Sequence, residues 1–230
     1  MPAQKNQAEK DSIELLQKVG HVEITYYTDP LCCWSWAFEP EWQKLKLALG
    51  GRLKYRYCMG GLLPSWKNFH DVFNSVSRPV QMGPVWMHAA EVSGIKIQND
   101  IWVKDPPASS YPACFAFKCA ESQSADAGEK YLQCLRRACM LESRNIAKKD
   151  VLLELAFELA KDKTIKFNYT QFERDMANNR SLDALRKDLN ETASFHITRF
   201  PTLVIKTQTR NAKLITGYNK YERVCRVITS

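Results

Sequence analysis

The sequence has no apolar run that approaches the roughly 20 residues needed to span a bilayer. Its first twenty residues alternate polar and charged side chains, without the apolar segment of a secretory signal. We therefore expect a cytoplasmic protein without membrane association, in which cysteines are reduced by default. The 230 residues are 45% hydrophobic and 25% charged, which excludes disorder, collagen-like repeats and small disulfide scaffolds.

Long basic runs are also absent, although 33 lysines and arginines outnumber 25 acidic residues and give a net charge of +8. The basic residues are scattered in short pairs such as Arg136 and Arg137, a pattern typical of solvated helix faces. We expect no nucleic-acid partner from this distribution.

Eight cysteines are present, but no two of them have C-x-x-C spacing. Cys114 with Cys119 and Cys134 with Cys139 are each five residues apart, which turns about 140° around a helix. The four histidines are not at ligand spacing from these cysteines, so the sequence predicts no metal site. We expect these cysteines and Cys225 to be small structural residues.

A βαβ unit is predicted near the start of the chain. Residues 21–29 alternate in the manner of a strand, and residues 53–59 predict a second strand. Between them an apolar stripe predicts a helix that ends at Gly50 and Gly51, and Pro40 should bend or interrupt it. The stripe consists of Trp34, Phe38, Trp42, Leu45 and Leu49. Strand, helix and strand with short connections favour a parallel pair.

The middle of the chain, residues 78–189, predicts helices and no strands. Side chains that favour helix starts recur along it, namely Ser109 or Ser110, Asp126, Asp150 and Thr170. We interpret 78–189 as an inserted helical subdomain. Residues 20–77 and 190–230 then form one α/β domain, and residues 1–19 form a polar extension.

Strand signals return late in the sequence. After a helix at about 181–192, residues 202–206 and 213–216 predict two strands that pair through a polar turn. Gly217 ends the second strand, and the segment after it predicts a closing helix.

Cys32 is the candidate nucleophile. It follows a predicted strand and stands at the first turn of a predicted helix, where free amides and the helix dipole stabilise a thiolate. The alternative is a buried apolar cysteine beside Leu31, Trp34 and Trp36. Position alone leaves both interpretations open.

Phe200, Pro201 and Thr202 precede a β-rich run far along the chain. A cis peptide bond before Pro201 suits a tight approach to a strand. Such a loop would leave the backbone of Phe200 free to pair with an extended ligand that carries a thiol.

Taken together, DPLCCWSWAFEP and RFPTLVI resemble the DsbA-like group of the thioredoxin fold, in its cytosolic branch. The resemblance implies an α/β thioredoxin fold with an inserted helical subdomain. It also implies that Cys32 is the attacking thiol, Pro201 the cis proline, and Phe200 the residue whose main chain aligns a partner. The loop of Gly60 and Gly61 is a further match.

Ser35 departs from the dithiol members of this group, which have their resolving cysteine at that position. A dithiol oxidant needs this second sulfur to expel its partner from a mixed disulfide. Ser35 can instead donate a hydrogen bond to a Cys32 thiolate and leave release to an outside thiol such as glutathione. The sequence therefore predicts C-x-x-S monothiol chemistry, with Cys32 and Ser35 as the catalytic pair.

Two other cysteines are possible resolving thiols. Cys33 could pair with Cys32 only through a strained ring, and we favour the interpretation that it fills a position where relatives often have proline. Cys58 ends the second predicted strand and should emerge at the same sheet edge as Cys32.

The predicted substrate-binding residues come from the two motifs and from the loop of Gly60 and Gly61. Trp34 should lie near the mouth of the site, and Arg199 stands where relatives commonly have glycine. The Arg199 charge can stabilise a thiolate or hold a carboxylate, or the residue can face solvent. The full predicted set is Trp34, Gly60, Gly61, Arg199, Phe200, Pro201 and Thr202.

Three functions remain open at this point. The first is a cytosolic thiol-disulfide oxidoreductase that handles glutathione or protein mixed disulfides. The second is an enzyme similar to kappa-class glutathione transferases and chromene-carboxylate isomerases, whose usual catalytic serine would be replaced by Cys32. The third is a non-enzymatic adaptor similar to DsbA-like proteins that present a substrate to a cytosolic protease. No tightly bound cofactor is predicted, and glutathione is a possible co-substrate.

Overall fold

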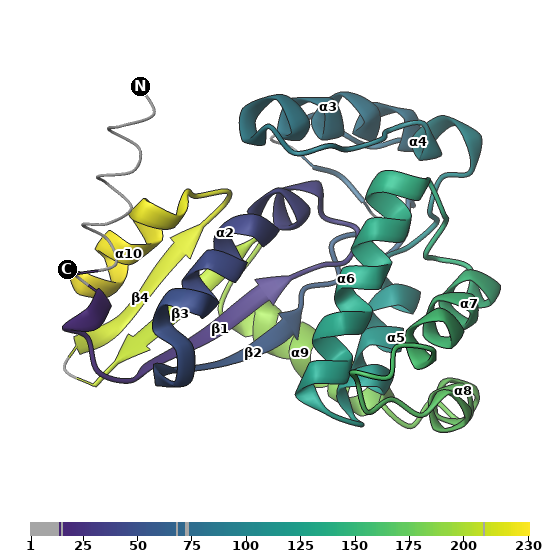
Figure 1. Ribbon diagram of the computed structural model, residues 1–230. Coiled ribbons are helices and arrows are strands. Elements are labelled where there is room, and N and C mark those ends of the chain that lie inside the picture. Colours follow the sequence, from purple (N-terminus) through teal and green to yellow (C-terminus); the bar gives the residue numbers. More distant parts are fainter. Residues whose placement is uncertain (1–13, 15, 68, 72–73, 209) are drawn as a thin grey trace.

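A mixed sheet of four strands is the centre of the molecule, in the order β2-β1-β3-β4 (Figure 1). β1 (Val22–Thr28) and β2 (Leu53–Met59) are parallel, whereas β3 (Thr202–Thr207) pairs antiparallel with both β1 and β4 (Arg210–Thr216). The computed structural model describes residues 14, 16–67, 69–71, 74–208 and 210–230. The α/β fold class, the βαβ unit and the late hairpin are thereby confirmed. Most of the predicted extension 1–19 lies outside the described residues.

α2 (Cys33–Leu49) connects the parallel strands and begins directly after Cys32. It runs through Pro40 without the expected interruption. A proline removes only one backbone donor, and the buried side chains of Phe38 and Trp42 hold both halves of α2 against the sheet. The helix ends at Gly50, whose φ of 52° is a backbone conformation that favours glycine.

The helical insertion follows β2. Most of its helices gather beyond the edge of the sheet that β2 forms, whereas α3 (Met82–Ser93) and α4 (Ile101–Lys104) lie above the start of α2 (Figure 1). α9 then packs on β2, and α10 packs on α2 and β4. The helices of the insertion and of the closing segment are η2 (Pro79–Gln81), α3 (Met82–Ser93), α4 (Ile101–Lys104), α5 (Tyr111–Glu121), α6 (Ala125–Glu142), α7 (Lys149–Ala160), α8 (Tyr169–Ala177), α9 (Leu182–Ser194) and α10 (Tyr221–Thr229), and η1 (Gly50–Arg52) precedes β2.

Three of the predicted helix starts were wrong by two residues. Lys148 precedes α7, so Asp150 lies inside its first turn. Ser124 caps α6 with its hydroxyl, which accepts from the Ala127 N–H, and Asn168 caps α8. Asp126 and Thr170 lie inside the first turns of these helices instead. Before α6 and before α8 the sequence has two possible capping side chains, two residues apart. The sequence pattern does not say which of the two caps the helix.

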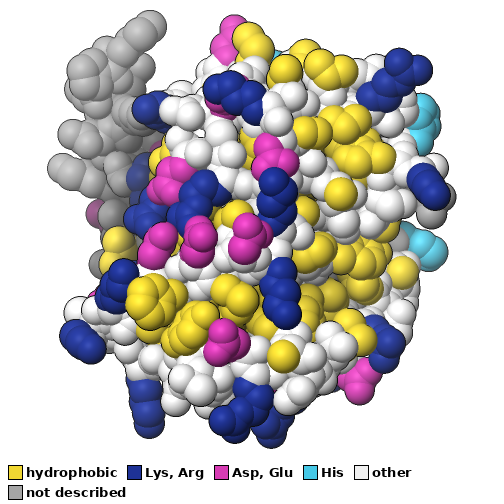
Figure 2. All heavy atoms as spheres, turned by 90° about the vertical axis from the view of Figure 1, so that its right-hand side faces the viewer, with side chains coloured by type: hydrophobic (Ala, Val, Ile, Leu, Met, Phe, Trp, Pro, Cys, Tyr) yellow, Lys and Arg dark blue, Asp and Glu magenta, His cyan; other side chains and the backbone are white. Residues whose placement is uncertain are grey.

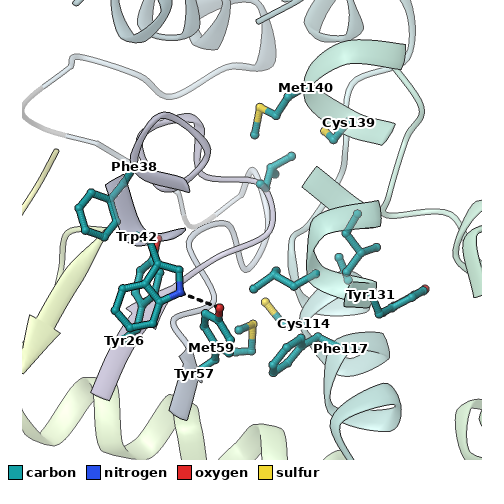
Figure 3. Close-up of a cluster of buried hydrophobic side chains, with 14 of the residues drawn as sticks. Tyr26, Phe38, Trp42, Tyr57, Met59, Cys114, Phe117, Tyr131, Cys139 and Met140 are labelled. Atoms are coloured by element: carbon teal, nitrogen blue, oxygen red, sulfur yellow. Dashed lines mark hydrogen bonds between the residues drawn. The ribbon is translucent and has the colours of Figure 1, made fainter. Parts of the chain in front are cut away.

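One hydrophobic core joins the sheet to the insertion (Figure 3). Trp42 meets Tyr26 and Tyr57 edge to face, and its indole N–H donates to the Tyr57 hydroxyl at 2.9 Å. Phe117 of α5 contacts Tyr57 from the other side, with ring centroids 5.9 Å apart. The insertion is therefore part of the framework that holds the ends of β1 and β2.

Candidate functional site

Cys32 is the N-cap residue of α2, and its backbone is extended. Its thiol donates to the carbonyl oxygen of Phe200, with Sγ 3.4 Å from that oxygen. Cys32 itself is only 5% exposed. The sequence thus placed Cys32 correctly at the helix start, and the structure places the thiol at the cis-proline loop.

The peptide bond between Phe200 and Pro201 is cis, as the sequence predicted. Antiparallel pairing of β1 with β3 places Tyr27 opposite Thr202, which brings this loop to the end of β1 beside Cys32. The Phe200 carbonyl accepts from the Cys32 thiol. A carbonyl oxygen has a second lone pair, so a ligand could pair with it beside the thiol. Pairing of the Phe200 backbone with a ligand stays a prediction.

Gly60 and Gly61 form a wall of the site after β2. The Gly60 N–H donates to the Thr28 carbonyl at 2.8 Å, and Gly61 has a positive φ of 62°. A Cβ at Gly61 would lie 2.6 Å from a Leu189 methyl. Only glycine fits this second position without strain.

A cleft of about 780 Å³ opens in front of Cys32, a size suited to a small ligand or a short peptide segment. α3 contributes Met82, Val85, His88 and Val92 to its lining. Seven of the predicted site residues also line it: Cys32, Cys33, Trp34, Gly60, Gly61, Arg199 and Phe200.

Pro201 and Thr202 are not among the lining residues of this cleft. Thr202 is buried, and its hydroxyl donates to the Arg199 carbonyl at 2.8 Å. The Pro201 carbonyl accepts from the Gly217 N–H at 2.7 Å. Both residues therefore shape the loop that presents Phe200 and Arg199.

Trp34 lies at the cleft, half-buried between two rings from distant parts of the chain. His88 of α3 meets it edge to face with centroids 5.6 Å apart, and Tyr218 lies on it at 6.3 Å. The apolar stripe of α2 did not predict these two neighbours of Trp34, because their positions depend on how α3 and the segment after β4 pack.

Burial raises the pKa of the Cys32 thiol, and the charge of Asp29 adds to the rise. The side chain and backbone N–H of Ser35 oppose it. The Ser35 hydroxyl is buried and has no hydrogen-bond partner among the described residues. Its O–H is thus available to donate to a negative charge on Cys32, and this is the direction in which Ser35 acts on the pKa of that thiol. The effect of burial on the Cys32 pKa outweighs that of the helix start, which favours a thiolate.

Neither possible resolving cysteine is exposed. Cys33 is 3% exposed, and burial raises its pKa well above the ordinary value. Cys58 packs in one buried cluster with Cys32 and Phe200, and burial raises its pKa to about 12. Its thiol donates to the Asp188 carbonyl at 3.5 Å. All eight cysteines are free thiols in this structure.

Asp29 is a site residue that sequence reasoning missed. It belongs to the DPLCCWSW motif, but a carboxylate before proline reads as an ordinary turn. In the structure Asp29 is fully buried beneath the cleft and accepts four hydrogen bonds. Within the described part of the chain, no group of three or more His, Cys, Asp or Glu side chains could hold a metal ion.

Comparison with known proteins places this geometry in a family. Residues 26–226 match the family model described as Thioredoxin. The chain belongs to the thioredoxin family. Its fold is DsbA-like: it superposes on a putative protein disulfide isomerase from Nitrosomonas europaea with a TM-score of 0.71, at 18% identity over 90% of this chain and 95% of that one.

A second solved structure is the cytosolic disulfide reductase DsbM from Pseudomonas aeruginosa, with a TM-score of 0.62 at 22% identity, covering 84% of this chain and 88% of that one. Among curated proteins, the chain is similar to the ClpXP adapter protein SpxH of Halalkalibacterium halodurans. The two are 31% identical over 183 residues, which cover 80% of this chain and 58% of that relative. No helix among the described residues is long and apolar enough to cross a membrane.

Proposed function

We propose that this protein carries out thiol-disulfide exchange in the cytosol through a single cysteine, Cys32, and forms mixed disulfides with glutathione or with protein thiols. The observation that carries the proposal is the surroundings of the Cys32 sulfur. It lies at the N-terminus of α2, against the Phe200 carbonyl of the cis-proline loop, with the unpartnered Ser35 hydroxyl beside it. A cleft opens in front of these groups.

The first chemical step joins Cys32 to a substrate disulfide. The Cys32 sulfur attacks one substrate sulfur, a new S–S bond forms, and the substrate S–S bond breaks. The Cys32 proton passes to the leaving thiolate, and Ser35 donates to the Cys32 sulfur while it carries negative charge.

The second step regenerates the thiol. Because serine occupies the resolving position, an external thiol such as glutathione must attack the substrate sulfur of the mixed disulfide. This thiol forms a disulfide with the substrate and returns its proton to Cys32, so atoms and electrons balance over both steps.

Oxidised glutathione tests the proposal directly. The native protein should gain one glutathione by intact mass, peptide mapping should locate it on Cys32, and excess reduced glutathione should remove it. Cys32→Ser should gain none, whereas Cys58→Ser should still gain one. No adduct on the native protein, or an adduct that persists in Cys32→Ser, contradicts the proposal.

A second candidate is a non-enzymatic adaptor, and the similarity to the ClpXP adapter protein SpxH favours it. The chain spans less than two thirds of that relative's length. Hydrophobic side chains gather on the side formed by the insertion, between charged residues (Figure 2). Exposed large hydrophobic residues of the insertion are Val80, Met87, Val92, Val103 and Phe157. Such surfaces suit a protein partner.

The two candidates differ in their need for Cys32. An adaptor for a protease such as ClpXP should promote degradation of its substrate equally well as native protein and as Cys32→Ala. Equal stimulation, together with no glutathione adduct, would favour the adaptor over exchange chemistry.

A further inference from the structure

Asp29 lies between the end of β1 and the start of α2, three residues before Cys32, and is fully buried. Its Oδ1 accepts from the Leu31 N–H at 2.8 Å, and its Oδ2 accepts from the Leu62 N–H at 2.7 Å. Leu31 belongs to the turn that leads into Cys32, and Leu62 follows Gly60 and Gly61 in the wall of the cleft. One carboxylate therefore ties the nucleophile's turn to the opposite wall.

The insertion also reaches this carboxylate. The Ser110 hydroxyl at the start of α5 donates to Asp29 Oδ2 at 2.8 Å, and the Cys114 thiol one turn later donates to it at 3.4 Å. The Ser110 hydroxyl in turn accepts from the Leu63 N–H at 3.1 Å, and the Ser110 N–H donates to the Leu63 carbonyl. Ser110 is thus a bridge between the insertion and the wall of the cleft.

We infer that Asp29 is the positioning residue of the Cys32 site, through which the helical insertion holds the Gly60–Leu63 wall against the nucleophile. The inference rests on the proposed function for the role of Cys32. Burial of a charge costs free energy unless hydrogen-bond donors surround it. The turn before Cys32, the Gly60–Leu63 wall and the start of α5 each supply a donor to Asp29, so the positions of these three segments depend on one another.

The charge of Asp29 also acts on the thiol. After burial, it is a cause of the raised pKa of Cys32. The charge of Asp29 also raises the pKa values of Tyr111, Cys114 and Cys139. For each of these groups burial is the larger cause. Asp29 thereby fixes the site in place and favours the protonated thiol that donates to Phe200.

The test uses the full chain and compares Asp29→Asn, Ser110→Ala and a control, Asp188→Asn. Asp188 is likewise buried and accepts from a backbone N–H, that of Met59 at 2.9 Å, but it does not contact the turn before Cys32. Two quantities are measured: the alkylation rate of Cys32 against pH, by peptide mass spectrometry, and hydrogen exchange of the Leu62 amide.

Asp29→Asn should shift the Cys32 alkylation profile to lower pH. Below the midpoint, the alkylation rate should rise about tenfold for each unit by which the Cys32 pKa falls. The same variant should speed hydrogen exchange of the Leu62 amide. Ser110→Ala, which keeps the charge, should speed Leu62 exchange and leave the midpoint of the profile unchanged. Asp188→Asn should leave the midpoint of the Cys32 profile unchanged. Its effect on Leu62 exchange is not used as a control, because Asp188 also holds the Met59 amide next to the wall and pairs with Lys118 of α5.

The inference is overturned if Asp29→Asn matches the native protein in both measurements. If Asp29→Asn does not fold, unchanged Leu62 exchange in Ser110→Ala overturns it. Neither readout requires exchange activity. A native protein that forms no mixed disulfide would therefore contradict the proposed function and leave this inference to its own test.

Discussion

The ring of Phe200 lies directly on Gly60, so closely that a Cβ added to Gly60 would overlap the ring. Gly60 follows β2, and Phe200 precedes β3, so the contact closes the space between two loops of the site. Phe200 packs in the same buried cluster as Cys32. The absence of a side chain at Gly60 is thus a condition for the burial of the Cys32 thiol.

Gly60→Ala should displace the Phe200 ring and expose Cys32. We expect a loss of about 1–3 kcal/mol in the free energy of unfolding, typical of overpacking, and faster alkylation of Cys32 at neutral pH. Urea unfolding and mass spectrometry of alkylated peptides measure the two effects. Gly51→Ala is the control, since nothing lies within 4 Å of a Cβ there. Slow alkylation in a folded Gly60→Ala protein would contradict the role of this contact.

Ser35 should lower the pKa of Cys32, so Ser35→Ala should slow alkylation at pH 8 by raising that pKa further. The rates of the two proteins should converge at high pH, where both thiols are ionised. Ser35→Cys should instead form a C-x-x-C disulfide and release a glutathione adduct without an outside thiol. Ser122→Ala, whose hydroxyl donates to the Cys119 carbonyl, is the control that should match the native protein.

The eight cysteines predict a loss of stability in alkaline solution. Burial raises the pKa of each of these thiols in the folded protein. An unfolded chain ionises its thiols near pH 8.5, so above that pH the folded state binds more protons than the unfolded state. This stabilisation is complete below about pH 8.5 and declines as the pH rises toward the folded pKa values.

Urea unfolding at intervals between pH 7 and pH 10 measures this decline. Each thiol contributes a slope of up to about 1.4 kcal/mol per pH unit. Cys139→Ala should reduce the slope above pH 8.5 by one thiol's contribution, whatever it does to stability at pH 7. An unchanged slope in that variant would be inconsistent with a buried, protonated Cys139.

Arg136 should be far more important for stability than its neighbour Arg137. The Arg136 guanidinium is fully buried, pairs with Glu39 of α2 and donates to the Thr28 hydroxyl. Arg136→Ala removes the ion-pair partner of Glu39 and leaves it with the hydrogen bonds from Gln43 and Gln133, which should lower the free energy of unfolding by about 3–5 kcal/mol. Arg137→Ala removes only an exposed ion pair with Glu142 and should change it by at most about 1 kcal/mol. Urea unfolding of both variants at pH 7 decides between these values.

Periodicity and turn residues predicted every strand and the position of α2, because apolar alternation and helical spacing are local signals. The two motifs also predicted the helix start at Cys32 and the cis bond before Pro201. Sequence position left open whether Cys32 is buried, and the structure shows that it is. The sequence could not decide this, because the burial depends on Phe200, Ile197 and Leu62, which pack around Cys32 from elsewhere in the chain. The part played by α3 in the cleft was missed for the same reason, and so was the carboxylate of Asp29.

The pairing of Tyr27 with Thr202 has a consequence for synthesis of the chain. Cys32 leaves the ribosome well before Phe200, whose carbonyl is its hydrogen-bond acceptor, and before β3, which follows Phe200. Until then the thiol has no cis-proline loop to cover it. A nascent or truncated chain should therefore present Cys32 to oxidants and alkylating agents, and protection of this one sulfur should report that the last strand pair has joined the sheet.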